Sequence, residues 1–430
     1  MNYDAIHYRL RALGPLRWLH GLLSTRSRHV IWSGVYGTLR AIESAAGVVS
    51  AVILLLPVVI VVTVTGRKIA PIGKVDHIGY LAQLPEYYLR LCESEGRDRS
   101  SLPILVWRSP CNKPLADKFH EHFIIVDAPI ISVLVDSAAP YLRLFRLFDQ
   151  SHLYYFQPKL YSTTGPALTL NDDERKIGRA MLAEIGIGPD DWFVCFHNRD
   201  DAYYANPAQA ARNSDIRLAV TAMEEVTRRG GYAIRMGAKV EHSLHDTGNP
   251  RIIDITTRPH SPFLDYYLCA NCRFFFGTSS GIVMVPLLFN VPVVTANQMP
   301  VHAMTMQCGI PYAPKLIVDG HGRPVPYKIA RDIGVFSGEI CHGVFEAAQA
   351  LKRAGLTFQE NSPEDLRDLV LDMFDVLEGR PPLGEAKPIQ DRFRDEFLAY
   401  SPKSLTHRGD PYCPLIGARF ALRHAELFDL

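Results

Sequence analysis

The chain has 430 residues, a formal net charge of +1, 47% hydrophobic residues and 21% charged residues. This length exceeds one ordinary core, so two or more packed units are expected. The composition excludes a disordered protein, and the small net charge gives no reason to expect a nucleic-acid partner.

The first 66 residues divide into a basic arm and an apolar segment. In residues 1–43, arginine and histidine alternate with leucine, tryptophan and tyrosine, which suits an anionic membrane surface or an amphipathic helix packed on the body. Residues 44–66 carry no charged side chain. A helix of about 20 such residues can cross ~30 Å of hydrocarbon.

Arginine and lysine flank the apolar segment on both sides, so the positive-inside rule predicts no orientation. The alternative is a buried strand over residues 58–64, but the apolar run is longer than the ~5–6 residues of an ordinary strand. We therefore expect a membrane-associated segment at 44–66. Pro57 would kink a helix here, which favours a shallow, in-plane or re-entrant insertion.

From residue 67 onward, short apolar runs alternate with helix-like segments. Runs at 102–109 and 122–129 are bounded by helix- and strand-breaking residues and predict buried parallel strands. They place a first Rossmann-like domain at 67–170, which ends in a linker that begins at residue 157.

A second Rossmann-like domain is predicted at 171–345. Its first helix begins after the cap Asn171, and strands are expected at 192–197, 232–237, 251–255, 273–277 and 291–296. Helices between these strands predict an α/β fold with a doubly wound parallel sheet. Residues 346–430 are expected to form a helical region that packs back on the body, with Ser362 and Asp365 as a capping box.

Ligands of a doubly wound sheet lie beyond the carboxyl ends of its strands. Three predicted strand ends carry polar or glycine residues: His197, Arg199, Asp200 and Asp201 after the first, Arg235 in the second, and Gly277, Thr278, Ser279, Ser280 and Gly281 after the third. Glycine backbone, hydroxyl donors and the start of a helix suit a diphosphate, and arginine can bind phosphate oxygens bidentately. The pattern therefore predicts a diphosphate site.

Structural roles stay open for the same residues. A Gly/Ser turn is often plain chain reversal, and an arginine at a strand end is often paired with a carboxylate, here Asp200, Asp215 or Asp265. Asp265 could hold Arg235 or cap its own helix.

The general base is left open between Asp200, Asp201 and His77, and His197 fits a structural role as well as a catalytic one. Arg212, Asn213 and Asp215 could meet the ligand or cap the next helix, and a cap at 213–214 is favoured.

No metal site and no cofactor are expected. Neither a P-loop nor a G-x-G-x-x-G sequence occurs, and no carboxylate cluster suggests a divalent cation. The eight cysteines lack zinc-ligand spacing and a disulfide framework, so they are predicted to be reduced thiols. Charge on a diphosphate would then be neutralised by arginine and by backbone amides.

Several segments in this order resemble one known family. They are HNRDDAYY at 197–204, RNSDI at 212–216, GGYAIRMG at 230–237, FLDYYLCANCRFFFGTSSGIVMVPLLFNVPVV at 263–294, and DHIGYLAQLPEYYLR at 76–90. The sequence is similar over residues 72–300 to an uncharacterised bacterial family identified as GT-B glycosyltransferases, which is distantly similar to inverting enzymes of the fucosyltransferase type.

The resemblance assigns roles to particular residues. His197, Arg199 and either Asp200 or Asp201 match an H-x-R-x-x-D motif, and Thr278, Ser279 and Ser280 match a serine-rich loop near the diphosphate. The family's Arg-Ile-Gly-His stretch is replaced here by residues 77–80, His-Ile-Gly-Tyr.

The resemblance implies two Rossmann-like domains that face a cleft, with the acceptor domain at 67–170 and the donor domain at 171–345. It implies metal-independent, inverting transfer of a sugar from a nucleoside diphosphate donor, with GDP slightly favoured, to a cell-envelope or lipid-linked glycan. The catalytic body would lie in the cytoplasm, at the inner-membrane surface. A sugar-nucleotide epimerase of similar two-lobed fold and a non-catalytic membrane-surface binding protein are the alternatives.

Overall fold

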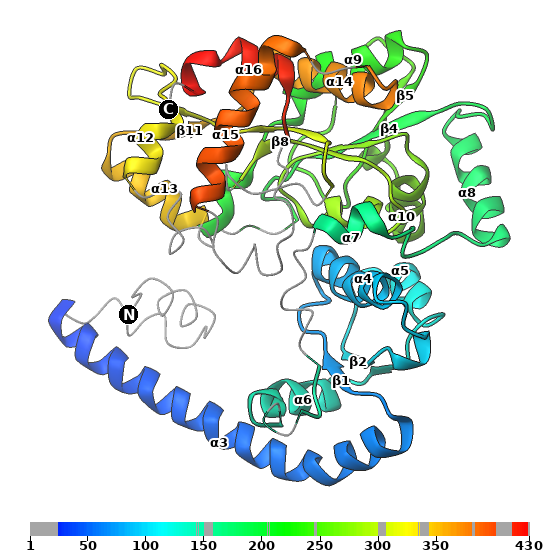
Figure 1. Cartoon of the computed structure of the whole chain (residues 1–430), viewed down its shortest axis with the longest axis vertical. Helices are drawn as coiled ribbons and strands as arrows, with labels where there is room; N and C mark the ends of the chain where they lie inside the picture. Colours follow the sequence, from blue (N-terminus) through cyan, green and yellow to red (C-terminus); the bar gives the residue numbers. More distant parts are fainter. Residues whose placement is uncertain are drawn as a thin grey trace. The chain divides into compact units, whose positions relative to one another are not determined.

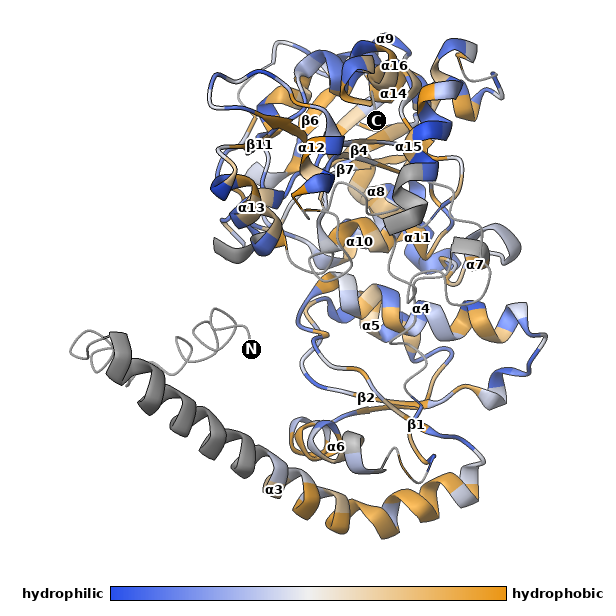
Figure 2. Ribbon diagram, turned by 60° about the vertical axis from the view of Figure 1, so that its left-hand side comes forward, coloured by the Kyte–Doolittle hydropathy of each residue, from blue (hydrophilic) through white to orange (hydrophobic). Residues whose placement is uncertain are grey.

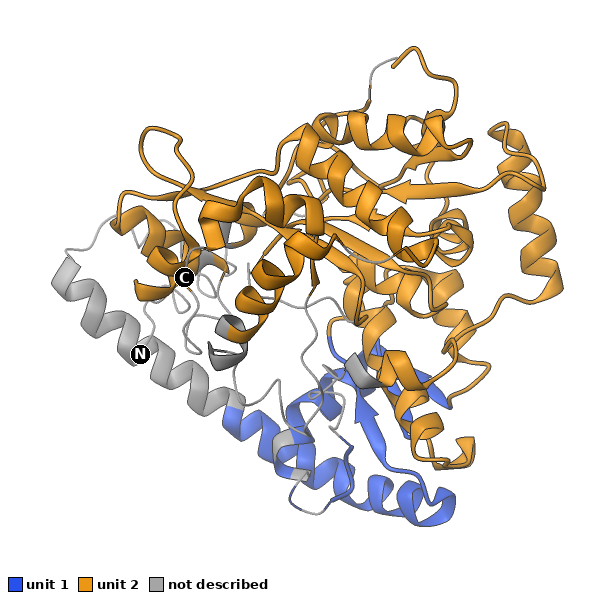
Figure 3. Ribbon diagram, turned by 45° about the horizontal axis from the view of Figure 1, so that its top comes forward, with its two compact units in different colours: residues 1–73, 103–108, 124–150 blue, residues 74–102, 109–123, 151–430 orange. Residues whose placement is uncertain are grey.

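The structure, a computed structural model, describes residues 25–142, 144, 146–149, 158–203, 205, 207–244, 247–299, 307–333, 335, 344–380, 383–400 and 415–428. The chain forms two compact units (Figure 3). Unit 1 takes residues 1–73, 103–108 and 124–150, and unit 2 takes residues 74–102, 109–123 and 151–430.

Unit 1 is a small parallel sheet with one helix packed on it and a second helix packed on the first. Its elements are α3 (Thr25–Thr65), β1 (Ile69–Pro71), β2 (Ile104–Trp107), β3 (Ile125–Asp127) and α6 (Pro129–Leu142), with strand order β1-β2-β3. Apolar side chains of both helices and of the sheet share one core, which includes Ala51, Val58, Val106, Val135 and Ala138. The apolar segment is thus part of a folded unit.

Helix α3 decides between the helix and the buried strand that the sequence allowed for residues 58–64. Residues 58–64 are helical, so the alternative of a buried strand there is wrong. Over Ser44–Thr65 this helix is long and apolar enough to cross a membrane, by length and composition alone. Residues 1–24 of the expected basic arm lie outside the described residues.

Unit 2 is built on a seven-stranded sheet in the order β12-β9-β8-β7-β4-β5-β6, in which every pair of neighbours is parallel. Its strands are β4 (Phe193–Phe196), β5 (Tyr232–Arg235), β6 (Ile252–Asp254), β7 (Phe275–Gly277), β8 (Val293–Gln298), β9 (Pro311–Pro314) and β12 (Leu415–Ile416). A separate antiparallel pair joins β10 (Leu316–Val318) to β11 (Thr357–Gln359).

Helices flank this sheet (Figure 1). The α-helices of unit 2 are α4 (Ile78–Ser94), α5 (Lys113–Phe119), α7 (Pro158–Thr163), α8 (Asp172–Glu184), α9 (Val220–Arg228), α10 (Pro262–Asn271), α11 (Met284–Leu287), α12 (Tyr327–Asp332), α13 (Val344–Arg353), α14 (Pro363–Leu377), α15 (Lys387–Tyr400) and α16 (Ala418–Arg423). The 3-10 helices are η2 (Arg99–Ser101), η5 (Pro207–Arg212), η6 (Ile216–Ala219), η7 (Ile255–Thr257), η8 (Gly281–Val283), η9 (Gly384–Ala386) and η10 (Ala425–Phe428).

The α/β fold class is confirmed. Each unit contains a parallel sheet, and the strands of the larger sheet are apolar and buried because helices cover both of its faces. Helices α9 and α14 lie on one face and α10 lies on the other (Figure 1). The chain runs from β4 outward to β5 and β6 and returns to β7 on the other side of β4. The switch point of the strand order is therefore between β4 and β7.

Three expectations about organisation differ from the structure. Helices α4 and α5 belong to unit 2, although the sequence grouped them with the strands of the first domain. The expected linker contains α7. Cys308 is disulfide-bonded, whereas eight reduced thiols were expected; Cys92, Cys111, Cys195, Cys269 and Cys272 are free.

Candidate functional site

The loops after β4, β7 and β8 are tied together at the switch point. The backbone nitrogen of Arg199 donates to Thr278 Oγ1 at 2.9 Å. Ser279 Oγ accepts from the backbone nitrogen of Met299 at 2.7 Å. Thr278 and Ser279 are both buried. Their hydroxyl groups therefore join three neighbouring strand ends.

The glycines of the loop after β7 are required by space. A Cβ on Gly277 would lie 2.8 Å from Val283 Cγ1, and one on Gly281 would lie 2.9 Å from the backbone nitrogen of Gly79. Neither Gly277 nor Gly281 has a positive φ. These glycines thus permit close packing, whereas the sequence suggested a need for unusual backbone angles. Ser280, between them, is half-exposed and its side chain does not cap η8.

Two arginines lie together beside this loop. Arg212 Nε donates to the Ser279 carbonyl at 2.8 Å, and its Nη1 donates to Gln209 Oε1 at 3.0 Å. Arg199 Nη1 donates to Asn213 Oδ1. Burial and the charge of Arg199 lower the pKa of Arg212 to about 10. Arg212 is still charged at neutral pH, so two cations adjoin the switch point; we call Arg199 and Arg212 the arginine pair.

A third cation, Lys315 at the end of β9, contacts the segment that follows β4. Lys315 is 5% exposed, and its Nζ donates to the Asn213 carbonyl at 2.6 Å. Burial lowers the pKa of Lys315, and the charge of Glu360 opposes that shift. Asn213 therefore connects Lys315 to Arg199.

The expected helix cap at 213–214 is wrong. The cap of η6 is Asp215, whose Oδ1 accepts from the backbone nitrogen of Arg217 at 2.9 Å. The Asn213 side chain is occupied by Arg199, because a guanidinium is a stronger donor than a backbone amide.

Arg235 is fully buried at the end of β5. Its Nη1 donates to the carbonyl of the next residue at 2.9 Å, and its Nη2 donates to Asn198 Oδ1 at 3.0 Å. Asn198 Nδ2 donates in turn to the Ser214 carbonyl at 2.5 Å. No carboxylate of the described residues forms an ion pair with Arg235; Asp254 and Asp200 act on its charge only at longer range. Arg235 presents no surface to a ligand and positions Asn198.

His197 is neutral in the folded protein. Burial and the charge of Arg235 lower the pKa of His197 to about 3. Its Nδ1 is buried and has no hydrogen-bond partner among the described residues. His197, Asn198 and Thr278 line a cavity of about 10 Å³, which has room for a single water molecule at most. This cavity is too small for a phosphate or a sugar.

The two aspartates after β4 differ in their surroundings. Asp200 accepts from the backbone nitrogens of Ala202, at 3.1 Å, and Glu241, at 3.0 Å, so it holds the loops after β4 and β5 together. Asp201 Oδ1 lies 3.7 Å from Arg199 Nη1, and its side chain is 35% exposed. Of these two, Asp201 has the carboxylate oxygen nearer to the arginine pair.

The amino terminus of α4 lies against the loop after β7, at the contact between the backbones of Gly79 and Gly281. His77 is the N-cap residue of α4, and its Nδ1 is hydrogen-bonded to Asp76 Oδ1 at 3.0 Å. Their side chains are 44% and 66% exposed. The tyrosine at position 80 is close enough to act on the pKa of Arg212. An exposed carboxylate–imidazole pair therefore stands at the start of α4, the helix that carries this tyrosine.

Asp265 has neither of its two expected roles. Its Oδ2 lies 2.7 Å from His260 Nε2, and this hydrogen bond raises the pKa of His260. The cap of α10 is Ser261, whose Oγ accepts from the backbone nitrogen of Leu264 at 3.2 Å. Arg235 is bonded elsewhere, so Asp265 does not hold it.

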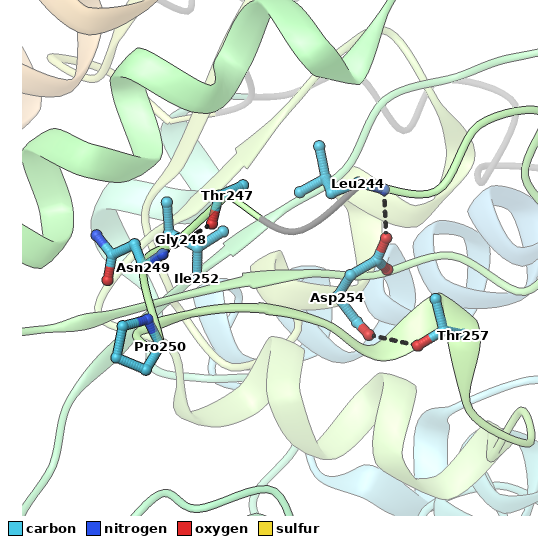
Figure 4. A pocket seen from close by; sticks show the side chains of 8 residues that line it. All are labelled: Leu244, Thr247, Gly248, Asn249, Pro250, Ile252, Asp254 and Thr257. Carbon is cyan, nitrogen blue, oxygen red and sulfur yellow. Dashed lines mark hydrogen bonds between the residues drawn. The ribbon is translucent and has the colours of Figure 1, made fainter.

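A larger cavity, of about 420 Å³, lies along the edge strand β6 (Figure 4). Asn249, Asp254 and Thr257 contribute polar groups to its lining, and no lysine or arginine does. Asp254 Oδ2 already accepts from the backbone nitrogen of Leu244 at 2.6 Å. This cavity therefore lacks the cations that a diphosphate needs. No group of His, Cys, Asp and Glu side chains able to hold a metal ion occurs in the described parts of the chain.

Sequence reasoning overlooked three residues of the site. Asp76 directly precedes His77 at a predicted helix start, and Asn198 lies inside the HNRDD motif, so both were within reach. Lys315 had no local signal, because its partner Asn213 is 102 residues away.

No protein-family model matches the sequence, and no curated protein sequence matches it. Among solved structures, the ADP-heptose LPS heptosyltransferase II of E. coli is 13% identical, over 53% of this chain and 84% of that chain, with a TM-score of 0.35. A glycosyl transferase family 9 protein of Veillonella parvula is 12% identical, over 67% and 96%, with a TM-score of 0.37. The UDP-GlcNAc 2-epimerase of Methanocaldococcus jannaschii is 13% identical, over 70% and 82%, with a TM-score of 0.22. The likeness is distant, and function has to be inferred from the residues of this chain.

Proposed function

We propose that this chain is a glycosyltransferase that takes its sugar from a nucleoside diphosphate donor. The observation that carries the proposal is the arginine pair at the switch point. Arg212 donates hydrogen bonds to the Ser279 carbonyl and to the Gln209 side-chain oxygen, and no carboxylate of the described residues forms an ion pair with it. The charge of Arg212, next to that of Arg199, favours a negatively charged ligand such as a diphosphate.

The surroundings of the arginine pair suit a diphosphate leaving group. The amino terminus of α4 meets the loop after β7 at the contact of Gly79 and Gly281, and this helix end adds positive potential. Guanidinium groups and amides fixed in this way stabilise the negative charge that develops on the departing nucleotide. This is the support for a metal-independent transferase, with arginine in place of Mg²⁺.

The exposed pair of Asp76 and His77 supplies the general base in this proposal. Asp76 is hydrogen-bonded to Nδ1 of His77 and would orient the ring for proton transfer from the acceptor hydroxyl. GDP is the favoured nucleotide through the resemblance to fucosyltransferase-type enzymes, the transfer is inverting, and the acceptor is a cell-envelope or lipid-linked glycan. The catalytic body would work at the cytoplasmic face of the inner membrane.

The proposal is tested by measuring the binding of GDP, UDP, CMP and dTDP to the full chain in the presence of EDTA, with the shift in Tm as the readout. Wild type is compared with Arg212→Gln and with the control Arg217→Gln, which changes an exposed arginine paired with Asp215. One diphosphate should raise the Tm of wild type and of the control, and its effect should be lost in Arg212→Gln.

The same nucleotide sugar is then incubated with membrane extract. Sugar transferred to glycan or lipid supports the transferase, whereas epimerised free nucleotide sugar supports the epimerase. If no nucleotide shifts the Tm while all three proteins are folded, the proposed donor site is wrong.

A further inference from the structure

Helix α3 has two faces between Ser44 and Thr65, and both are apolar. Gly47, Ala51 and Val58 are buried, and they follow one another at helical spacing on the face that packs in unit 1. The opposite face carries Val49, Leu56 and other valines and isoleucines that are exposed. An ordinary surface helix would carry charged residues there, so we expect this second face to contact another apolar surface.

Helix α6 also carries exposed apolar side chains. It packs on α3, and its Ile130, Ile131 and Val133 are 77%, 43% and 45% exposed. Among the described residues, twelve of the 21 large apolar side chains that are more than a third exposed lie on these two helices, nine on α3 and three on α6. Figure 2 shows α6 and the coloured part of α3 as predominantly hydrophobic. Such a concentration marks a binding surface, because scattered exposed residues would need no explanation.

The packing of α3 fixes how this surface can meet a bilayer. A Cβ on Gly47 would lie 2.5 Å from Tyr141 Cε2, so α3 and α6 touch closely near the start of the apolar segment. Val58, near the segment's far end, belongs to the same apolar core as Val106 of β2, so this end is also part of the folded unit. If α3 crossed a bilayer in this state, it would carry a three-stranded sheet with open edges into hydrocarbon, which is strongly unfavourable. An in-plane position avoids this cost.

Charge indicates the kind of surface that covers these helices. Arg67 and Lys68 follow directly after the apolar segment, so its carboxyl-terminal margin is basic, whereas Arg40 and Glu43 both precede it and Asp136 is exposed on α6. Cations at the margins of an apolar face bind the headgroups of anionic lipids, at roughly 1 kcal/mol per basic residue near the surface. A second copy of this chain would present the same cations and would repel them.

We propose that α3 and α6 together form an in-plane, membrane-binding face of unit 1 that docks on a bilayer containing anionic phospholipid. The outward side chains enter the outer part of one leaflet, ~5–10 Å deep, and the sheet stays outside the hydrocarbon. This inference does not depend on the enzymatic activity proposed above.

Flotation of the full chain with vesicles tests the proposal. Vesicles of phosphatidylcholine with phosphatidylglycerol should bind the protein more tightly than phosphatidylcholine alone, and salt should weaken the difference. The double variant Ile53→Asp, Ile60→Asp should reduce binding by roughly tenfold or more, because two carboxylates would enter the interface. The matched control is Ile177→Asp, Ile329→Asp, which alters two equally exposed isoleucines of unit 2 and should bind as wild type does.

Insertion depth separates the in-plane helix from a spanning one. A fluorescent amino acid is placed at Val49, Leu56 or Val64, and its emission is quenched by lipids that carry spin labels at known depths. Equal depth at the three positions is expected for an in-plane helix; a maximum at Leu56 would overturn the proposal in favour of a span. Unchanged vesicle binding by the folded double variant would also overturn it. So would a lipid-free dimer that this variant dissociates, because a second copy would then cover the face.

Discussion

The backbones of Gly79 and Gly281 are in direct contact, although the residues are far apart in the chain. A Cβ on Gly79 would lie 2.9 Å from the Cα of Gly281. This contact brings the start of α4 against the loop between β7 and η8. The HIGY stretch and the GTSSG loop, which the sequence shows as separate motifs, are therefore two sides of one site.

Gly281→Ala should separate these two sides. The new methyl group would lie 2.9 Å from a backbone nitrogen, which cannot move as a flexible side chain can, so we expect a loss of about 1–3 kcal/mol of stability and weaker nucleotide binding. Urea denaturation and nucleotide titration measure the two effects. Gly384→Ala is the control, because nothing lies within 4 Å of a Cβ there. Equal behaviour of the two variants would show that the contact is dispensable.

Removal of the proposed general base should affect turnover more than donor binding. His77→Gln should lower kcat by about 10²–10⁴-fold, because proton transfer from the acceptor is lost, and should leave the nucleotide Kd near its wild-type value. Asp76→Asn should have a smaller effect in the same direction, since Asp76 only orients the ring. His321→Gln, at an exposed turn, is a control for histidine loss. A His77→Gln enzyme with normal kcat would move the base to another residue, with Asp201 the next candidate.

A buried ion pair holds α4 in unit 2. Arg90 Nε donates to Glu86 Oε1 at 2.9 Å, and the Arg90 Nη groups donate to Thr164, Leu287 and other groups. Arg90→Met should cost about 3–5 kcal/mol of unfolding free energy, because Glu86 would keep its burial and lose its cation. Glu86→Gln together with Arg90→Met should cost less than Arg90→Met alone.

Urea denaturation measures both variants of the buried pair. Arg97→Met is the control, because Arg97 pairs with a carboxylate at the surface, and it should change stability by less than about 1 kcal/mol. A double variant less stable than the single one would show that Glu86 is stabilising by itself.

Local patterns were enough to predict most of the larger sheet. Its strands β4, β5, β7 and β8 coincide with predicted apolar runs, because a parallel strand covered on both faces has no reason to alternate. The helix starts at Asn171 and Ser362 were predicted as well, and both form capping boxes. A cap depends on residues three positions apart, which a sequence displays directly.

The partners of the site's charged residues could not be predicted in this way. Arg235 binds Asn198 and Arg212 binds the Ser279 carbonyl, over separations of 37 and 67 residues. The sequence offered nearby carboxylates as partners for strand-end arginines, and Asp265 instead binds His260. Which strand ends adjoin depends on the order of the sheet, and the sequence does not state that order.

The neutral His197 should make the protein sensitive to acid. Its pKa is about 3 in the folded protein against 6.5 for an ordinary histidine, because the ring is desolvated and lies near Arg235. Between these pH values the unfolded chain binds a proton that the folded protein does not. The free energy of unfolding therefore decreases as pH falls from 6.5 towards 3, and the contribution of His197 is fully present only above about pH 6.5.

His197→Gln removes the ring that binds this proton in the unfolded chain, so it should make the free energy of unfolding less sensitive to acid. In urea denaturation at pH 7.5, 6.0 and 5.0, wild type should lose more stability than the variant as pH falls. NMR gives an independent measure: the ring signals of His197 should stay constant from pH 8 to 5. The His260 ring should titrate above pH 6.5, because its hydrogen bond to Asp265 raises its pKa. A His197 signal that titrates near 6.5 would mean that the ring reaches solvent. The small cavity lined by His197, Asn198 and Thr278 would then be accessible to a ligand.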